Sequence, residues 1–422
     1  MRRLLAFLSL ALGAACAPAR PPAARDDARI LAGDIAFYES RLPRDPHGAR
    51  DRAVLGGLYL ARSRATGSAS DLARAESLAR ASLGLRHGRN ADAARVLVAS
   101  LMAGHRFAEA RQVLWPVGVA TPEDIVTRAT LGELALELGR YAEADSLFGG
   151  LGIQRMEPAV GPRYARWLEL SGQSGAAREL LDALRDRQAT AYRVPTSELA
   201  WLDLRLGELA MRNGRPDLAA TALARGRRLA PADHRLLAAS ARLAAGREAW
   251  ADAVRFADSA LAQLPEPGTL VVLLDAARAQ GDTAAAGEYR RALQATTRGG
   301  PAALHRDWAL YLLDHQGADR ALLAAIAAQH AERHDVYTHD LVAWARYRTG
   351  DLAGARVLAD SALLRHVRDA TLYAHAARIA LATGDRPAAL ARVREAVAIA
   401  PRFPGPVARD ARALLDSLEA AP

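Results

Sequence analysis

The densest histidine stretch of the chain, QHAERHDVYTHD, places His330 and His334 four residues apart. On a helix this spacing would bring both imidazoles to one face, where they could bind a metal ion. A zinc hydrolase of that type needs a glutamate directly after the first histidine, whereas here the acid is Glu332, one position later. We therefore interpret the stretch as a solvated helix end followed by a new helix start, with Thr338 and Asp340 as its N-cap and first-turn residues, and expect no metal.

The basic residues exclude two large classes of enzyme. All 56 residues of the Lys+Arg count are arginines, because the sequence contains no lysine. A P-loop needs a lysine on the phosphates, and a pyridoxal enzyme needs one for its Schiff base. The single cysteine, Cys16, excludes intramolecular disulfides and cysteine-rich zinc sites. Since no Gly-x-Ser-x-Gly or Gly-x-Gly-x-x-Gly motif is present either, we predict a protein that is not an enzyme, without catalytic residues or cofactors.

The arginines also give the chain a formal net charge of +9, from 56 basic and 47 acidic residues. A GC-rich genome would produce this abundance of Ala, Arg and Gly, and the arginines would then lie on a solvated surface. The alternative is a basic face that binds an acidic partner. Aromatic residues make up only 5%, and the apolar residues are mostly Ala and Leu, which favours helices over strands.

The N-terminal stretch MRRLLAFLSLALGAAC has the features of an export signal. Arg2 and Arg3 precede an apolar run, residues 4–15, that is shorter than the roughly 20 residues needed to span a bilayer. A charged start followed by a short apolar run is typical of a secretory signal peptide, which we assign to residues 1–15. Residues 16–29, rich in Pro and Ala and without apolar periodicity, are predicted to form a semi-extended tether.

The small pair Ala14 and Ala15 directly before Cys16 resembles the lipobox of bacterial lipoproteins. The resemblance implies that Cys16 is lipidated and becomes the new N-terminus. The sequence departs from the family at Gly13, where the lipobox prefers leucine. The alternative is an ordinary cleaved signal peptide in which Cys16 has no role.

A repeat with a period of 34 residues is the strongest pattern in the sequence. TGDLAGARVLADSAL at 349–363 returns as TGDRPAALARVREAV at 383–397. Other pairs of equivalent residues are 33 or 34 positions apart: Gly139 and Gly172, Ala144 and Ala177, Phe148 and Leu181, Ala219 and Ala253, and Pro231 and Pro265. Such a period predicts stacked supersecondary units.

One unit, residues 202–231, shows how the pattern specifies a helical hairpin. Gly207 in the first helix allows a neighbouring helix to approach closely, and Gly214 ends that helix. Ala219 and Leu223 share a face of the second helix. A single hairpin cannot bury its apolar face alone, so copies must stack.

These units resemble the tetratricopeptide repeat over residues 50–403. The best matches to the motif are Leu131, Gly132, Gly139, Ala144, Phe148, Ala253, Ala257, Ala260, Pro265, Ala377, Ala380, Ala389, Val393, Ala396 and Pro401. The resemblance implies an all-α, right-handed superhelical solenoid of about ten repeats over residues 30–422. We expect a longer loop at 185–199, where the phase breaks, and a C-terminal capping helix at 405–421.

In this family the first helix of each hairpin lines a concave groove that binds protein or peptide ligands. The equivalent positions here are occupied by Arg166, Trp201, Arg212, Arg242, Trp344, Tyr347, Arg348 and Arg378. Arginine binds carboxylates in a bidentate manner, so the ligand would be an acidic or C-terminal segment. The alternative is that the aromatic rings pack between helices and the arginines are solvated. The groove lacks the Asn and Lys of the carboxylate clamp, which argues against recognition of a chaperone C-terminus.

Three functions remain open. The leading hypothesis is a non-catalytic interaction scaffold, lipid-anchored on the periplasmic face of the outer membrane or soluble in the periplasm. The second is an accessory or recruiting subunit of an envelope enzyme complex. An RNA-binding helical repeat is disfavoured by the export signal and the scarcity of aromatic groove residues, so we expect no nucleic acid. The oligomeric state is left open.

The lipidation hypothesis predicts that Cys16→Ser releases the protein from the membrane fraction or leaves it unprocessed. Each buried CH₂ of an acyl chain contributes about 0.8 kcal/mol, and two chains are enough for stable anchoring. Fractionation and immunoblotting of cells expressing both forms would measure this. Unchanged membrane partition of Cys16→Ser would contradict lipidation.

Overall fold

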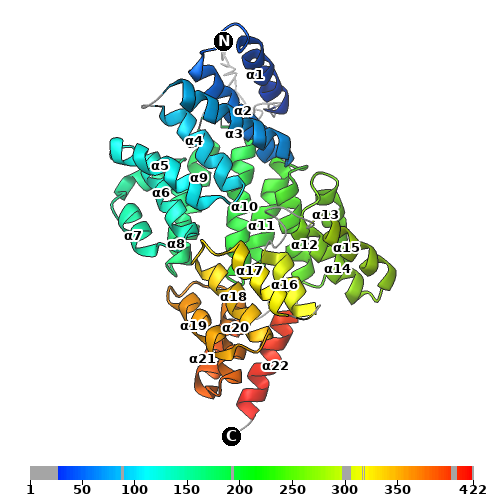
Figure 1. Cartoon of the computed structure of the whole chain (residues 1–422). Coiled ribbons are helices and arrows are strands. Elements are labelled where there is room, and N and C mark those ends of the chain that lie inside the picture. Colours follow the sequence, from blue (N-terminus) through cyan, green and yellow to red (C-terminus); the bar gives the residue numbers. More distant parts are fainter. Residues whose placement is uncertain are drawn as a thin grey trace, which may run out of the picture.

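The computed structural model describes residues 27–86, 90–191, 194–296, 306–315, 317, 319–400 and 406–420. Within these ranges the chain forms 22 α-helices and one 3-10 helix, and no strand (Figure 1). The predicted all-α solenoid is therefore confirmed. The signal peptide at 1–15, Cys16 and most of the tether lie outside the described residues.

Twenty of the helices pair into ten consecutive hairpins, preceded by α1 (Asp27–Arg41) and followed by α22 (Pro406–Ala420); α16 and α17 pair through the core cluster of Leu313 and Ile326. The first five hairpins are α2 (Ala49–Thr66) with α3 (Ala69–Leu85), α4 (Ala91–Ala103) with α5 (Phe107–Ala120), α6 (Ile125–Glu137) with α7 (Tyr141–Gly149), α8 (Gly161–Leu170) with α9 (Ser174–Thr190), and α10 (Thr196–Arg212) with α11 (Pro216–Leu229). The second five are α12 (His234–Gly246) with α13 (Trp250–Leu261), α14 (Pro267–Ala279) with α15 (Thr283–Thr296), α16 (Arg306–His315) with α17 (Arg320–Gln329), α18 (Val336–Arg348) with α19 (Leu352–Leu363), and α20 (Ala370–Ala382) with α21 (Arg386–Ile399). The 3-10 helix η1 (Gly152–Met156) lies between α7 and α8.

Every hairpin turns through one residue in the left-handed backbone conformation. Eight of these residues are glycine, the type that adopts this conformation without strain: Gly67, Gly139, Gly172, Gly214, Gly281, Gly317, Gly350 and Gly384. The other two hairpins use His105 and Glu248, with φ of 57° and 56°. The recurring glycines of the sequence pattern are thus the turns that fold each helix back on its partner.

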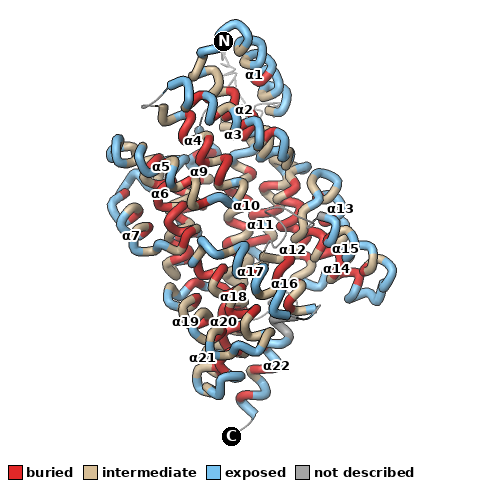
Figure 2. Tube along the Cα trace, in the orientation of Figure 1, coloured by how far each residue is buried: buried red, intermediate tan, exposed pale blue. Residues whose placement is uncertain are grey.

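Small residues let the two helices of a hairpin pack closely. A Cβ atom at Gly207 on α10 would lie 2.6 Å from a Leu223 methyl carbon on α11, and one at Gly132 would overlap the ring of Phe148. Both Leu223 and Phe148 are fully buried. Figure 2 shows the buried residues running through the middle of the stacked hairpins, with exposed residues at the turns and on the outer sides.

Two boundaries differ from the sequence prediction. The longer loop expected at 185–199 is wrong for most of that range, because α9 continues to Thr190 and α10 begins at Thr196. The extra residues lengthen these helices to 17 residues each, since the segment before Pro195 contains no residue that would end α9 earlier. At the N-terminus, α1 already begins at Asp27, inside the predicted tether.

The superhelix contacts itself after one turn. The Val336 N–H donates to Tyr141 Oη at 2.8 Å, and Arg365 Nε donates to the Leu170 carbonyl at 2.9 Å; both pairs are 195 residues apart. Arg333 likewise binds the Glu137 carboxylate at 2.9 Å. We call this region the inter-turn contact: the turns of hairpins three to five lie against the segments 333–336, 365–367 and 399–400.

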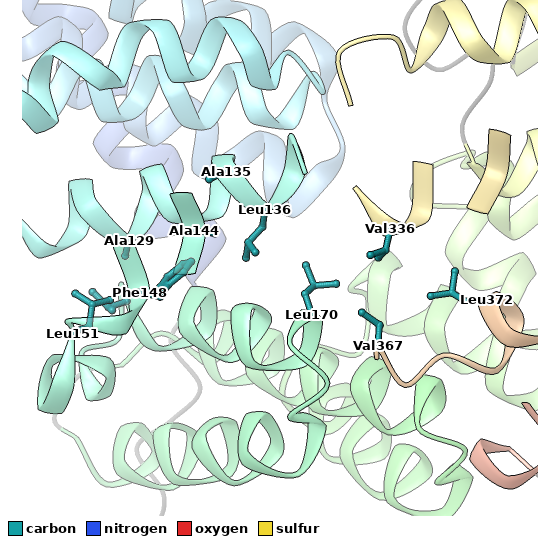
Figure 3. Close-up of a cluster of buried hydrophobic side chains, with 11 residues drawn as sticks. Ala129, Ala135, Leu136, Ala144, Phe148, Leu151, Leu170, Val336, Val367 and Leu372 are labelled. Atoms are coloured by element: carbon teal, nitrogen blue, oxygen red, sulfur yellow. The ribbon is translucent and has the colours of Figure 1, made fainter. Parts of the chain in front are cut away.

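An apolar core fills the inter-turn contact. Leu136 and Leu170 from the earlier superhelical turn pack with Val336, Val367 and Leu372 from the later one (Figure 3). All five side chains are at most 3% exposed. Because this cluster also includes Phe148 and Leu151, the core of hairpins three and four continues without interruption into hairpins nine and ten.

The turn glycines of the inter-turn contact adopt the left-handed conformation and also leave room for the backbone of the other superhelical turn. A Cβ atom at Gly139 would overlap the His334 backbone, and one at Gly214 would overlap the Ile399 carbonyl. At Gly350, in contrast, no atom lies within 4 Å of that position. Only glycine therefore lets the two superhelical turns meet at these points.

We predict that Gly139→Ala is considerably more destabilising than Gly350→Ala. The left-handed conformation costs alanine about 1–2 kcal/mol at either position. At residue 139 the overlap with the His334 backbone adds a further cost of about 1–3 kcal/mol, as overpacking does. Urea unfolding followed by circular dichroism measures both variants. Equal losses of stability would contradict the inter-turn contact.

Candidate functional site

The predicted groove residues all lie on first helices of their hairpins: Arg166 on α8, Trp201 and Arg212 on α10, Arg242 on α12, Trp344, Tyr347 and Arg348 on α18, and Arg378 on α20. First helices of neighbouring hairpins pack against one another, as α6 with α8, α10 with α12 and α18 with α20 do. Second helices of neighbouring hairpins pack far less closely. The first helices therefore form the concave side of the solenoid, which we call the inner face.

Three of the predicted arginines belong to two adjoining groups of ion pairs on the inner face. Glu169 binds both Arg166, at 2.7 Å, and Arg212, at 2.5 Å. One hairpin further on, Glu208 binds Arg205 at 2.7 Å and Arg242 at 3.5 Å. We call these six residues the inner-face charge cluster; it joins α8, α10 and α12.

The acids of this cluster are ionised in spite of their surroundings. Burial opposes ionisation of Glu169, but Arg212 and Arg166 hold its pKa well below the ordinary value. The pKa of Glu208 is lowered in the same way, against burial, by Arg205, Arg212 and Arg242. Four guanidinium groups face two carboxylates, so these six residues together carry a formal charge of +2; the Glu137 carboxylate also acts on Arg166.

A further arginine, Arg64 at the end of α2, adds to the positive charge. Its side chain is exposed, yet the surrounding protein and the nearby Arg163 and Arg235 lower its pKa. The charged groups that act on Arg64, which are Arg163, Glu133 and Arg235, stand on the first helices α8, α6 and α12, so Arg64 faces the concave interior. Among the described residues, no carboxylate forms an ion pair with Arg64, although Glu133 is close enough to affect its pKa.

Tyr337 connects the charge cluster to the later superhelical turn. The guanidinium of Arg166 lies 5.4 Å from the centre of its ring, and that of Arg306 lies 5.2 Å away. Burial raises the pKa of Tyr337 to about 12, so its hydroxyl stays protonated. Arg306 also forms an ion pair with the buried Asp340 at 2.8 Å, and Asp340 in turn contacts His375 at 2.8 Å.

The structure places Trp344 in the core between hairpins. The side chain is 6% exposed, its Nε1–H donates to Asp314 at 2.7 Å, and its ring stacks on His375 at 4.1 Å and on Tyr347 at 4.9 Å. A buried ring cannot serve as an open anchor for a ligand. Trp201 is half-buried and packs within the cores of hairpins four to six.

The two remaining predicted residues do not join the charge cluster. Arg348 is exposed, and Arg378 pairs with Asp410 on α22 at 3.2 Å. The motif positions also place Glu208 on the inner face, but sequence reasoning did not identify Glu169, Glu208 or Asp340 as the ion-pair partners of these arginines. The first two had a visible signal, since each stands three residues after an arginine and therefore on the same side of its helix.

The histidine stretch does not form a shared ligand face. His330 follows the last residue of α17, and His334 lies in the segment before α18, where its backbone N–H donates to the Leu138 carbonyl. Within the described ranges, no group of three or more His, Cys, Asp or Glu side chains is arranged to hold a metal. Nor does any helix there combine the length and apolar character required to cross a bilayer.

No protein-family model and no curated protein sequence matches the chain. Among solved structures it is similar to PilW, described as a widely conserved type IV pilus biogenesis factor, with a TM-score of 0.41 and 19% identity over 49% of this chain and 94% of PilW. It is also similar to a chain of the APC/C hetero-tetramer Cut9–Hcn1, with a TM-score of 0.34 and 13% identity over 93% of this chain and 94% of that one.

We predict that Trp344→Ala lowers the stability of the fold by about 3–5 kcal/mol, as the loss of a large buried ring does. The exposed Arg348→Gln on the same helix should change it by less than about 0.5 kcal/mol. Thermal unfolding followed by circular dichroism compares the two. If Trp344→Ala were as stable as Arg348→Gln, the assignment of Trp344 to the core would be wrong.

Proposed function

We propose that the protein is a non-catalytic protein–protein interaction scaffold whose inner face binds an acidic segment of its partner. The observation that carries the proposal is the unbalanced charge of the inner face. The cluster around Glu169 and Glu208 has two positive charges in excess, and Arg64 lies on the same concave side. A carboxylate-rich ligand would supply the missing negative charge and make bidentate bonds to the guanidinium groups.

Two of the arginines are best placed to make these bonds. Arg242 has a side chain that is 40% exposed and a long 3.5 Å contact to Glu208, which already has Arg205 as a closer partner. Arg64 is exposed and lies near Arg235. Arg235 is on α12, seven positions before Arg242. Residues seven positions apart share a side of a helix, so Arg242 lies on the same side of α12 as Arg235, about two helical turns further along.

We further propose that Cys16 carries a lipid that holds this scaffold on the periplasmic face of the outer membrane, the tether giving it reach from the bilayer. The support is the lipobox-like sequence before Cys16. A soluble periplasmic form is the alternative. If the protein is instead an accessory subunit of an envelope enzyme complex, its inner face would recruit a protein to the enzyme.

The double variant Arg64→Gln with Arg242→Gln tests the inner face. A fluorescent peptide of alternating Asp, Glu and Gly should bind the wild type, and the variant should bind it about tenfold or more weakly, because each lost ion pair removes a carboxylate contact. Fluorescence anisotropy at several salt concentrations measures both. Binding by the wild type should weaken as salt screens the charges.

The matched control is Arg255→Gln on the second helix α13, an arginine that is 60% exposed but off the inner face. It should bind like the wild type, and a peptide with Gln and Asn in place of the acids should not bind. Equal affinity of wild type and double variant would exclude the inner face as the site. Tighter binding of a single-stranded RNA than of the peptide would favour the RNA-binding alternative.

A further inference from the structure

A cavity of about 510 Å³ opens where the two superhelical turns meet, away from the inner-face charge cluster. It is lined by Gly172 of the earlier turn and by His366, Arg368, Tyr373, Ala391, Arg392 and Glu395 of the later turn. This volume lies within the range of small-molecule sites. Gly172, in the turn of hairpin four, closes one edge of the cavity.

The wall between the two turns is firmly fixed. Arg365 donates from Nη2 to Ser171 Oγ at 2.6 Å and to Asp145 Oδ1 at 2.9 Å, next to its bond to the Leu170 carbonyl. A Cβ atom at Gly172 would lie 2.9 Å from the His366 carbonyl oxygen, so the two backbones touch at this edge. The position of the wall is therefore set by the inter-turn contact and does not depend on a ligand.

His366 is held at this edge in an unfavourable backbone conformation. Its φ is 53°, in the left-handed region that side-chain-bearing residues rarely adopt, and its side chain is exposed beside the cavity. Unlike the hairpin turns, this position does not fold one helix back on its partner. Strained residues of this kind concentrate at ligand sites, where the strain fixes the position of a functional side chain.

The polar groups of the cavity are mainly donors. Arg392 is largely buried and held in place by the Ala376 carbonyl at 3.2 Å and by Asp360. Arg368 is 45% exposed and reaches Glu395 only at 3.8 Å, a long and weak contact. Burial raises the pKa of Tyr373, so its hydroxyl remains a donor, and among the described residues it has no hydrogen-bond partner.

We propose that this cavity binds a small organic oxyanion, a carboxylate or a phosphate ester, through Arg368, Tyr373 and His366. Arg392 is already neutralised by Asp360, so the groups left to bind an anion are Arg368, whose 3.8 Å contact with Glu395 is long, and the Tyr373 hydroxyl. The anion would replace Glu395 as the partner of Arg368, and the apolar part of the ligand would pack against Ala391.

Isothermal titration with citrate and with glycerol 3-phosphate tests the site and separates the two kinds of oxyanion. We expect the wild type to bind at least one of the two with a millimolar or lower dissociation constant and to gain thermal stability from it. Arg368→Gln and Tyr373→Phe should each weaken that binding about tenfold or more. Tyr373→Phe keeps the packing of the ring, so its folding is not at risk.

The matched control is Arg394→Gln, which removes an exposed arginine of α21 that pairs with Glu419 outside the cavity. It should bind the anion like the wild type. The absence of binding by both probes, or equal affinities of wild type, Arg368→Gln and Tyr373→Phe, would overturn the proposal. This site is independent of the proposed scaffold function, because Arg368→Gln should leave binding of the acidic peptide to Arg64 and Arg242 unchanged.

Discussion

The contact of the solenoid with itself is the constraint on which the rest of the structure depends. A hairpin array needs only its nearest neighbours to be stable, and its concave side is then open. Here Gly139, Gly172 and Gly214 let the turns of hairpins three to five meet the segments before α18, before α20 and after α21. This contact encloses the inner face, buries Val336 and Val367, and forms the cavity beside His366.

The enclosed interior explains how the charged residues are arranged. An arginine on an open surface can remain solvated, but one within the superhelix is partly removed from water and needs a partner. Arg166, Arg212 and Arg306 have such partners in Glu169 and Asp340. The two superhelical turns are linked by these pairs through the ring of Tyr337, so the polar interior contributes to the same contact as the apolar core.

The hairpins themselves could be predicted from the sequence, because they depend on local features. The 34-residue spacing of the glycines indicates the turns, and Gly207 opposite Leu223 indicates close packing within a hairpin. The pairing of hairpin three with hairpin nine left no such signal. No sequence pattern relates residues that are 195 positions apart. A turn glycine that contacts a second superhelical turn also cannot be told from one that does not, because both are needed for the hairpin turn itself.

The candidate site could likewise be predicted only as far as it depends on motif positions within one hairpin. Arg166, Arg212 and Arg242 were found because motif positions give the inner face, but the positions do not say which acids neutralise them. Trp344 occupies an inner-face position in the motif, yet it lies in the core because His375 and Asp314 from neighbouring hairpins cover it. The excess charge that remains at Arg64 and Arg242 appears only when all pairs are seen together.

The offset of 195 residues between the segments that meet at hairpins three and four also restricts how this chain can change its length. Open repeat proteins gain and lose whole repeats, since each unit needs only its neighbours. In this chain, one hairpin added or removed between α9 and α18 would shift the later turn by a full unit, and Val336 would no longer meet Tyr141. The number of hairpins in that interval is therefore fixed by the geometry of the superhelix, and length variation is tolerated only at the two ends.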